Sequence, residues 1–412
     1  MKNKSMILEG VSVSAEKSKL NIKYCTELSR WVLTPLGIWT NENNKNIINK
    51  ISSTVLIFMC YFLILFLIVP CSLHTFINER DPRIKMKMIG PLSFCLMAIS
   101  KFSFLVTRKK DIYNCFKHIY HDWRQVQLID DENIMLENAG KGRFITIICA
   151  AFMYGGGFFY HTIMPFAVGS FVTSDNKTIK PLTYPVYDPL FSAQETPNYQ
   201  IVFTLQWFAG FVMYSITIGA CSLAAVFAFH ACGQLKIVIS RLDNFVDLNH
   251  NIDDVLKKKM ADIIERHLRT LRFIVRVEEI LNELNLIEFL GCTFNICMLV
   301  YYFMSEFEKA EVISTITYCV LLISFTFNIF IFCYIGEMLT QQGLKVGWAA
   351  YNNINWYELS RKNSRGIILI MAISNNPCSL TAGKMTSLSY ASFCSVIRSS
   401  MAYLNILRTV VL

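Results

Sequence analysis

Residues 378–412 close the chain with the sequence CSLTAGKMTSLSYASFCSVIRSSMAYLNILRTVVL. The last part, residues 387–412, is long enough to cross the hydrocarbon core of a bilayer, which needs about 20 residues. Serines, arginines, an asparagine and a threonine separate its apolar residues, so it is too polar for a helix that faces only lipid. Polar groups at membrane depth persist only against protein or water. The stretch therefore predicts a helix that is either buried in a membrane bundle or lines an aqueous path.

The composition indicates a membrane protein. The chain has 412 residues, of which 53% are hydrophobic and 17% are charged, whereas soluble proteins carry roughly 25% charged residues. The net charge of +9 does not predict a nucleic-acid partner, because the basic residues are spread over the loops between apolar runs. Most of the 14 cysteines lie within apolar runs and none shows metal-ligand spacing. We therefore expect them to be small core residues, with no metal and no cofactor.

Seven segments have the length and composition of membrane spans, so the predicted fold class is all-α, a polytopic seven-transmembrane helix bundle. The predicted spans are residues 51–73, 86–106, 144–168, 201–229, 286–304, 312–339 and 387–412. The first four spans form a unit, 51–229, with a loop at 169–200, and the next two form the unit 286–339. The other segments are an amino-terminal segment 1–50 with an interfacial helix, a helical anchor segment 230–285 and a link and anchor 340–386. Residues 1–20 show no apolar periodicity, and no regular structure is predicted there.

Three local features refine this picture. Lys101 lies near the end of the second span, where snorkelling of its long side chain to the interface is the simplest explanation. Three glycines at 155–157 indicate close helix packing or a kink in the third span. No proline or glycine interrupts residues 253–290, so a single helix is expected to run from Asp253 to Met304, over about 78 Å at ~1.5 Å per residue. Its amphipathic stripe is predicted at Met260, Ile264, Leu268, Leu271, Val275 and Ile280.

The loops predict which side of the membrane each end faces. The amino-terminal segment and the loops after the second, fourth and sixth spans hold about four times as many Lys and Arg residues as the opposite side. The positive-inside rule therefore predicts a cytoplasmic amino terminus and an extracellular carboxyl terminus. This orientation places the Asn176-Lys177-Thr178 sequon outside the cell, where Asn176 is a candidate for glycosylation.

Several phrases in the chain resemble the insect odorant receptor family. They are TAGK at 381–384, LSYASF at 388–393, SMAYLNILR at 400–408, FCYIGE at 332–337 and LGIW at 36–39. The resemblance covers the whole chain in span number, loop lengths and orientation. The sister gustatory receptors close with a Thr-Tyr pair followed by Gln-Phe, and this signature is broken here at Ala402-Tyr403 and Thr409-Val410.

The resemblance implies a subunit of an odorant-gated, non-selective cation channel in the plasma membrane of olfactory sensory neurons. Four subunits of such a channel meet around the seventh helix, and a ligand-specific subunit joins a common co-receptor subunit in a hetero-tetramer. This chain resembles the ligand-specific subunit, because its loop after the fourth span lacks the long insertion of the co-receptor. A gustatory-type chemoreceptor channel and a membrane transporter are the alternatives, although no internal repeat indicates a transporter. No paired carboxylates or nucleophile motif within the spans indicates an enzyme.

The resemblance places a pocket for small volatile or hydrophobic ligands in the outer halves of the second, third, fourth and sixth spans. Burying apolar area, worth roughly 25 cal/mol per Å², is the main interaction that such ligands offer. His161 is the one titratable group well inside an apolar run, and it suits either a packing role or a ligand contact. The candidate ligand residues are Phe94, Cys95, Met97, Gly157, Tyr160, His161, Trp207, Phe208, Phe211, Tyr318 and Leu322.

The final helix is the candidate pore. Helical spacing places Tyr403, Ile406 and Val410 on one side, with Asn405 and Thr409 adjacent. Around a fourfold axis, Ile406 and Val410 would form an apolar ring that gates by dewetting. In the competing hypothesis this face packs against another helix and the co-receptor alone conducts. Residues predicted to act in assembly are Leu268, Leu271, Val275 and Phe393.

Overall fold

The computed structural model describes residues 2–39, 47–126, 128–168, 171–172, 178–187, 193–245, 253–308, 311–354, 356–357 and 359–411. Most of the described residues are helical, and they also include two short antiparallel hairpins. The first part holds α1 (Lys2–Leu33), α2 (Ile47–Leu73), η1 (His74–Asn78), α3 (Pro82–Thr107), α4 (Lys109–Gln125), α5 (Ile129–Phe158), η2 (Phe159–Ile163), α6 (Met164–Val168), β1 (Phe171–Val172) and β2 (Thr178–Ile179). The second part holds α7 (Asn198–Asp243), α8 (Asp253–Glu308), α9 (Val312–Asn352), α10 (Arg361–Ser374), β3 (Thr381–Ala382), β4 (Thr386–Ser387) and α11 (Tyr390–Val411).

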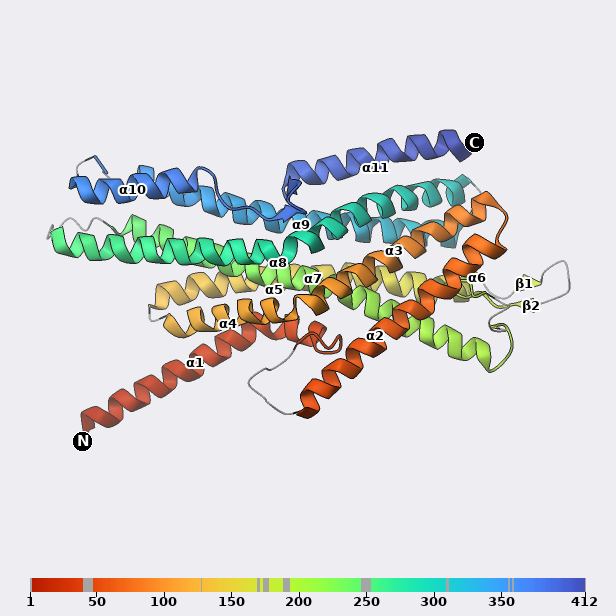
Figure 1. Ribbon diagram of the computed structural model, residues 1–412, viewed down its shortest axis with the longest axis horizontal. Helices are drawn as coiled ribbons and strands as arrows, with labels where there is room; N and C mark the ends of the chain where they lie inside the picture. The colour runs from red at the N-terminus through yellow and green to blue at the C-terminus, as the bar shows by residue number, and fades with distance from the viewer. Residues whose placement is uncertain are drawn as a thin grey trace.

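The helices form an elongated bundle with two different ends (Figure 1). At one end, called here the anchor end, lie α4, α10 and the adjoining parts of α7, α8 and α9. At the other, the loop end, lie α6, β1 and β2, the turn between α2 and α3, and the carboxyl terminus (Figure 1). The helix α11 starts near the middle of the bundle and runs to the loop end, so it covers only the half that carries the apolar spans.

Six helical segments among the described residues are long and apolar enough to cross a membrane. They are Ile47–Asn78, Ile84–Thr107, Ile129–Ala167, Asn198–Asp243, Val255–Phe307 and Val312–Asn352. The seventh predicted span corresponds to α11, which has 22 residues and is not among these six. Its serines and arginines lower its hydropathy, as its sequence indicated.

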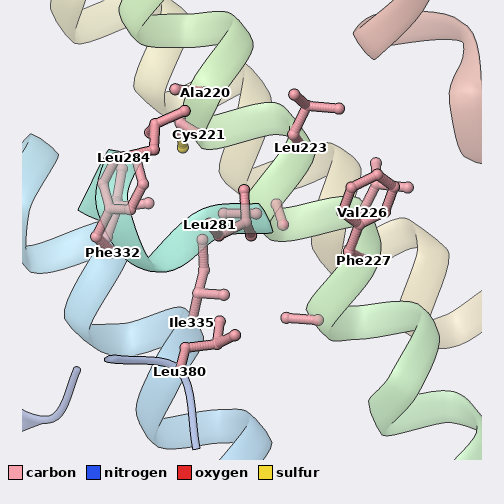
Figure 2. Close-up of a cluster of buried hydrophobic side chains, with 14 of the residues drawn as sticks. Ala220, Cys221, Leu223, Val226, Phe227, Leu281, Leu284, Phe332, Ile335 and Leu380 are labelled. Atoms are coloured by element: carbon pink, nitrogen blue, oxygen red, sulfur yellow. The ribbon is translucent and has the colours of Figure 1, made fainter. Parts of the chain in front are cut away.

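The central helix of the bundle is α7. In the most apolar 18-residue stretch of α7, 89% is buried inside the protein, against 28% to 56% in the corresponding stretches of the other five spans. This part of α7 is therefore surrounded by protein. Small residues allow this close packing: a Cβ atom at Gly219 would lie 2.9 Å from Leu33 of α1. Figure 2 shows the core where α7 meets α8, α9 and the segment before β3, with labelled side chains Ala220, Cys221, Leu223, Val226, Phe227, Leu281, Leu284, Phe332, Ile335 and Leu380.

The helices extend further than the predicted spans. Whereas spans were expected to end near residues 229 and 339, α7 continues to Asp243 and α9 to Asn352. Together with the first half of α8 these extensions build the anchor end. The prediction of one uninterrupted helix is confirmed, since α8 contains 56 residues. The expectation of no regular structure before residue 20 is wrong, because α1 begins at Lys2.

The buried stripe of α8 is rotated from the predicted one. Leu268 and Val275 are 39% and 45% exposed, and Leu271 is half-buried. The stripe is displaced because α4, α7, α9 and β3 all contact this helix. The residues that it buries are Met260, Ile263, His267, Thr270, Phe273, Ile274, Val277, Ile280, Leu281 and Leu284.

Lys101 does not snorkel, which corrects the expectation from the sequence. Its side chain and that of Glu288 are both 0% exposed, and Nζ lies 2.8 Å from the Glu288 carboxylate. Nζ also donates to Thr217 Oγ1 at 2.8 Å, and Asn328 donates its amide to the same carboxylate. One residue each from α3, α7, α8 and α9 thus meets inside the bundle. An ionised lysine is tolerated there because its partner and its hydrogen bonds are already in place.

Candidate functional site

A small cavity of about 40 Å³ lies in the half of the bundle toward the loop end. Its walls are mostly aromatic and come from α3, η2, the loop after β2, α7, α8 and α9. The lining residues are Gly90, Pro91, Phe94, Tyr160, Tyr184, Tyr214, Asn295, Met298, Leu299, Tyr302, Tyr318, Leu321 and Phe325. The volume suffices for roughly three water molecules and is well below the roughly 300–1,000 Å³ of typical ligand pockets.

A π-helical turn places Tyr160 in this wall. The glycines before it allow two close approaches: a Cβ atom at Gly156 would lie 2.7 Å from the Ser324 hydroxyl, and one at Gly157 would lie 2.2 Å from the Tyr214 ring. Ser324 in turn donates to the carbonyl of Phe152 at 3.0 Å. Such π-turns are frequent at functional sites. The glycines predicted to pack closely therefore bring α5 against α7 and α9, and η2 then directs Tyr160 inward.

The polar groups around the cavity fall into two sets. The Tyr302 hydroxyl donates to the Met86 carbonyl and accepts from the Gly90 amide at 3.1 Å. Asn295 accepts from Ser93 at 3.0 Å and donates to the carbonyl of Gly291 at 2.8 Å. These groups are therefore already engaged.

Two hydroxyls remain available. Within the described part of the chain, no hydrogen bond engages the hydroxyl of Tyr160 or of Tyr318, and no charged side chain lines the cavity. A cavity with two such donors and no charge suits a neutral molecule that carries a hydrogen-bond acceptor.

His161 supports the cavity from behind. The side chain is 3% exposed, and its Nδ1 lies 3.4 Å from the Tyr214 hydroxyl. A Cβ atom at Gly210 would lie 2.5 Å from Nε2, so the imidazole fits against bare backbone of α7. Nε2 has no hydrogen-bond partner among the described residues.

The loop after β2 closes the cavity through Tyr184. Its backbone amide donates to the side chain of Gln206 at 3.2 Å, and the Gln206 amide donates back to the Tyr184 carbonyl at 2.8 Å. Burial raises the pKa of the Tyr184 hydroxyl well above its usual value, so the ring stays neutral at physiological pH. Gln206 on α7 thereby fixes this loop over the site.

The predicted ligand residues occupy three environments. Phe94, Tyr160 and Tyr318 line the cavity, and Gly157 and His161 contact Tyr214 behind it. Three others lie within the bundle but do not line the cavity: Cys95 is buried, Met97 packs against Gly291 of α8, and Leu322 is half-buried. The last three, Trp207, Phe208 and Phe211, are 40%, 50% and 45% exposed on the outer face of α7.

Sequence reasoning missed the contribution of α8 to this site. Asn295, Met298, Leu299 and Tyr302 lie on a helix that had been considered only for assembly. The available signal was Asn295, a polar residue inside an apolar span, for which a specific partner is expected. Tyr184 and Tyr214 were also missed, and no local pattern distinguishes them from other aromatic residues.

The helix α11 packs one face on α8 and leaves the other uncovered in the single chain. Ser400 donates to the Thr293 carbonyl at 3.0 Å, and Val396 and Leu404 are 1% and 6% exposed. On other faces Met401 and Tyr403 are 45% and 54% exposed. The backbone of α11 includes positions 405–411, but the side chains of Asn405, Ile406, Thr409 and Val410 lie outside the described residues, as does Asn176.

A hairpin attaches α11 to α8. Glu278 of α8 accepts hydrogen bonds from the amide, at 2.8 Å, and the hydroxyl of Thr381. Asn285 donates to the Thr381 carbonyl at 3.0 Å, and the Gly383 amide donates to the Asn282 carbonyl at 2.8 Å. The turn of this hairpin has positive φ at Gly383 and Lys384. These hydrogen bonds connect α8 to the segment just before α11, and at the start of α11 Phe393 packs edge-on against Phe330 of α9.

Comparisons with known proteins agree with this architecture. A family model described as 7tm odorant receptor matches residues 85–401. The Anopheles gambiae odorant receptor Or2 is 22% identical over 319 residues, which cover 76% of this chain and 81% of that one. Odorant receptor 67c of Drosophila melanogaster is 26% identical over 187 residues, 45% of each chain.

The fold is also similar to a solved structure, the insect olfactory receptor OR5 from Machilis hrabei in complex with eugenol. The TM-score is 0.73 at 13% identity, and the alignment covers 97% of this chain and 99% of that one. A second structure of the same receptor gives a TM-score of 0.71. The predicted all-α seven-helix bundle is confirmed, whereas the orientation of its termini stays a prediction.

Proposed function

The chain belongs to the 7tm odorant receptor family, and on that premise we propose that it is the ligand-specific subunit of an odorant-gated, non-selective cation channel. It is a multi-pass membrane protein, and a receptor rather than an enzyme. In the proposed assembly it joins a common co-receptor in a hetero-tetramer, with a cytoplasmic amino terminus, in the plasma membrane of olfactory sensory neurons. The gustatory and transporter alternatives have no comparable support, since the matched family model is that of odorant receptors.

The aromatic cavity supports the ligand assignment more directly than any other observation. Its ligand would be a small neutral molecule whose carbonyl, ether or ester oxygen accepts from Tyr160 or Tyr318, while the rings of Phe94, Tyr214 and Phe325 cover its apolar part. Each Å² of apolar area buried contributes roughly 25 cal/mol. Because the cavity holds only about 40 Å³, ligand entry must displace side chains or helices, and α8 forms one of the walls that would move.

The connection between α8 and α11 supports a coupling from this cavity to a pore. Binding at the cavity would shift α8, and the Glu278–Thr381 hydrogen bonds would carry the shift to α11. In the proposed tetramer the uncovered face of α11 surrounds the conduction path, with Ile406 and Val410 as the apolar gate and Tyr403, Asn405 and Thr409 nearby. A change from 1:99 to 99:1 in the open population needs about 5.5 kcal/mol of differential binding, which several ligand sites could share.

The ligand assignment is tested with Tyr160→Phe and Tyr318→Phe, which remove a hydroxyl and keep the ring. Each lost hydrogen bond contributes about 0.5–1.5 kcal/mol, so we expect the half-maximal concentration of an acceptor-bearing agonist to rise roughly three- to tenfold. The measurement is ligand-evoked current after co-expression with a co-receptor, at matched surface expression.

The comparison variant is Trp207→Phe, on the outer face of α7. A shift with Trp207→Phe and none with either tyrosine variant would place the ligand on the exposed aromatic face and contradict the cavity. Unchanged responses in all three variants would contradict both locations.

The pore assignment is tested with Ile406→Cys and Val410→Cys in a Cys394→Ser background, because Cys394 is an exposed native cysteine. Thiol reagents applied from outside should reduce the ligand-evoked current at one or both positions. Ser400→Cys, on the buried face against α8, is the matched control and should stay unmodified. Currents that persist unchanged in both pore variants would mean that the co-receptor alone conducts.

A further inference from the structure

A second, larger cavity of about 400 Å³ is lined by the end of α1, by residues just after it and by one side of α4. Figure 1 shows α4 at the anchor end. The lining of this cavity combines an apolar and aromatic floor with a basic rim, and none of the described residues that line it is acidic. The floor consists of Leu33, Ile38, Trp39, Ile112, Tyr113, Phe116 and Tyr120, and the polar rim of Lys109, Lys117, His121, Arg124 and Gln125.

Two basic residues of this rim keep exposed side chains. Lys117 and Arg124 are exposed, lie two helical turns apart on α4, and form no ion pair in the part of the chain that the structure describes. Lys109 donates to the Gly37 carbonyl at 2.8 Å and to the Ser53 hydroxyl at 2.7 Å. A neighbouring hollow on the other side of Lys117 differs, because Asp111 and Glu279 line it together with arginines.

The position of Ser53 relates the cavity to the membrane. Ser53 lies near the start of α2, whose outward residues Ile47, Ile48, Ile51 and Val55 are 74%, 76%, 57% and 58% exposed. Exposed aliphatic side chains on the first turns of a membrane span face lipid. The bond from Lys109 to Ser53 therefore places the rim beside the border of the hydrocarbon layer. Further along α4, Lys117 and Arg124 lie on the water side of that border.

We propose that this cavity binds the phosphorylated headgroup of an anionic membrane lipid. Lysine and arginine pair with phosphate oxygens through charge-assisted hydrogen bonds, and the cytoplasmic leaflet is the one that carries anionic lipids. The aromatic floor covers the apolar side of the headgroup, and the acyl chains lie along the exposed aliphatic face of α2. The inference rests on the orientation proposed above, which directs α4 into the cytoplasm.

A phosphate-bearing ligand could also be soluble, and the two sources differ in their acyl chains. A lipid gains binding free energy from contacts with the exposed face of α2 as well as with the rim, whereas a free inositol phosphate contacts only the rim. The lipid should therefore bind substantially more tightly than its isolated headgroup.

The test measures binding of fluorescent phosphatidylinositol 4,5-bisphosphate to the purified full chain in phosphatidylcholine nanodiscs. Lys117→Ala with Arg124→Ala removes two rim charges, and we expect binding about 30-fold weaker, about fivefold for each basic residue. The matched control is Lys19→Ala with Lys23→Ala, which removes the same charge from exposed positions of α1 outside the cavity.

Two results would overturn the proposal. Equal weakening in the control would indicate attraction to the whole basic surface rather than a site. Competition by inositol 1,4,5-trisphosphate at the same concentration as the lipid would indicate a soluble phosphate ligand. The binding assay contains no agonist, so it tests only the lipid site. Ligand-evoked currents, recorded separately, test the proposed receptor function, and the two proposals can therefore fail independently.

Discussion

At the scale of single residues, the Lys101–Glu288 pair is the most consequential charge arrangement in the described bundle. Two ions without solvent contact lose their hydration, and their mutual attraction offsets that loss only when geometry and further hydrogen bonds are favourable. Here Thr217 accepts from the lysine and Asn328 donates to the carboxylate. We therefore expect the pair to fix the register of α3 against α7, α8 and α9 more than it adds net stability.

This account predicts unequal effects of single and double substitutions. Lys101→Met leaves Glu288 buried without its cation and should destabilise the protein by about 3–5 kcal/mol. Lys101→Met with Glu288→Met removes both charges and should recover most of that loss. The measurement is the temperature at which the detergent-solubilised protein loses its monodisperse elution peak.

The control for this pair is Lys110→Met, the same substitution at an exposed position of α4. It should leave the transition temperature unchanged. If the double variant proves as unstable as the single one, the pair itself provides stability and not only register.

At the scale of elements, α8 has three roles along its length. Its first half packs in the anchor end, its middle accepts the β3–β4 hairpin, and its last turns line the aromatic cavity. No proline or glycine interrupts the helix between the first two parts, whereas Gly291 separates them from the turns that line the cavity. The rotated stripe leaves Leu268 and Val275 partly exposed, and we propose that these two residues contact a neighbouring subunit. Leu271 and Phe393, which were also predicted to act in assembly, are half-buried against residues of the same chain.

The two faces of α8 predict two different failures. Ile274→Asp places a charge at a position that is 2% exposed and should prevent folding, since a buried unpaired charge costs several kcal/mol. Leu268→Asp, at a 39% exposed position, should fold and reach the detergent extract but fail to co-purify with the co-receptor. A normal hetero-tetramer from Leu268→Asp would mean that this face stays in water.

At the scale of the whole molecule, the two ends differ in composition as well as in shape. The basic α4 and the long extensions of α7, α8 and α9 gather at the anchor end, and the sequon belongs to the segment between β1 and β2 at the loop end. The positive-inside rule therefore predicts that the anchor end lies in the cytoplasm.

Glycan mapping tests this arrangement in cells. The native chain should carry one glycan at Asn176, and both Asn176→Gln and Thr178→Ala should remove the mobility shift that glycosidase treatment reveals. Asn251→Thr creates a new sequon at Asn249, in the segment between α7 and α8 that is predicted to be cytoplasmic, and should add no glycan. A glycan at Asn249 would reverse the proposed orientation.

The sequence by itself determined the class of fold, because apolar runs of bilayer length and an excess of basic loops need no tertiary information. It also indicated the unbroken α8, since helix continuity depends on local residue types. Phe94, Tyr160 and Tyr318 were selected from position along their spans together with family resemblance.

Only the tertiary structure decided how the helix faces are paired. The partner of Lys101 lies 187 residues away in the chain, so the sequence alone could not distinguish a buried pair from a snorkelling lysine. The same holds for the cavity: Tyr302 reaches the Met86 carbonyl, 216 residues away, and brings α8 into the wall. A helix in a crowded bundle buries more than one stripe, and which stripe meets which neighbour depends on contacts that are distant in sequence.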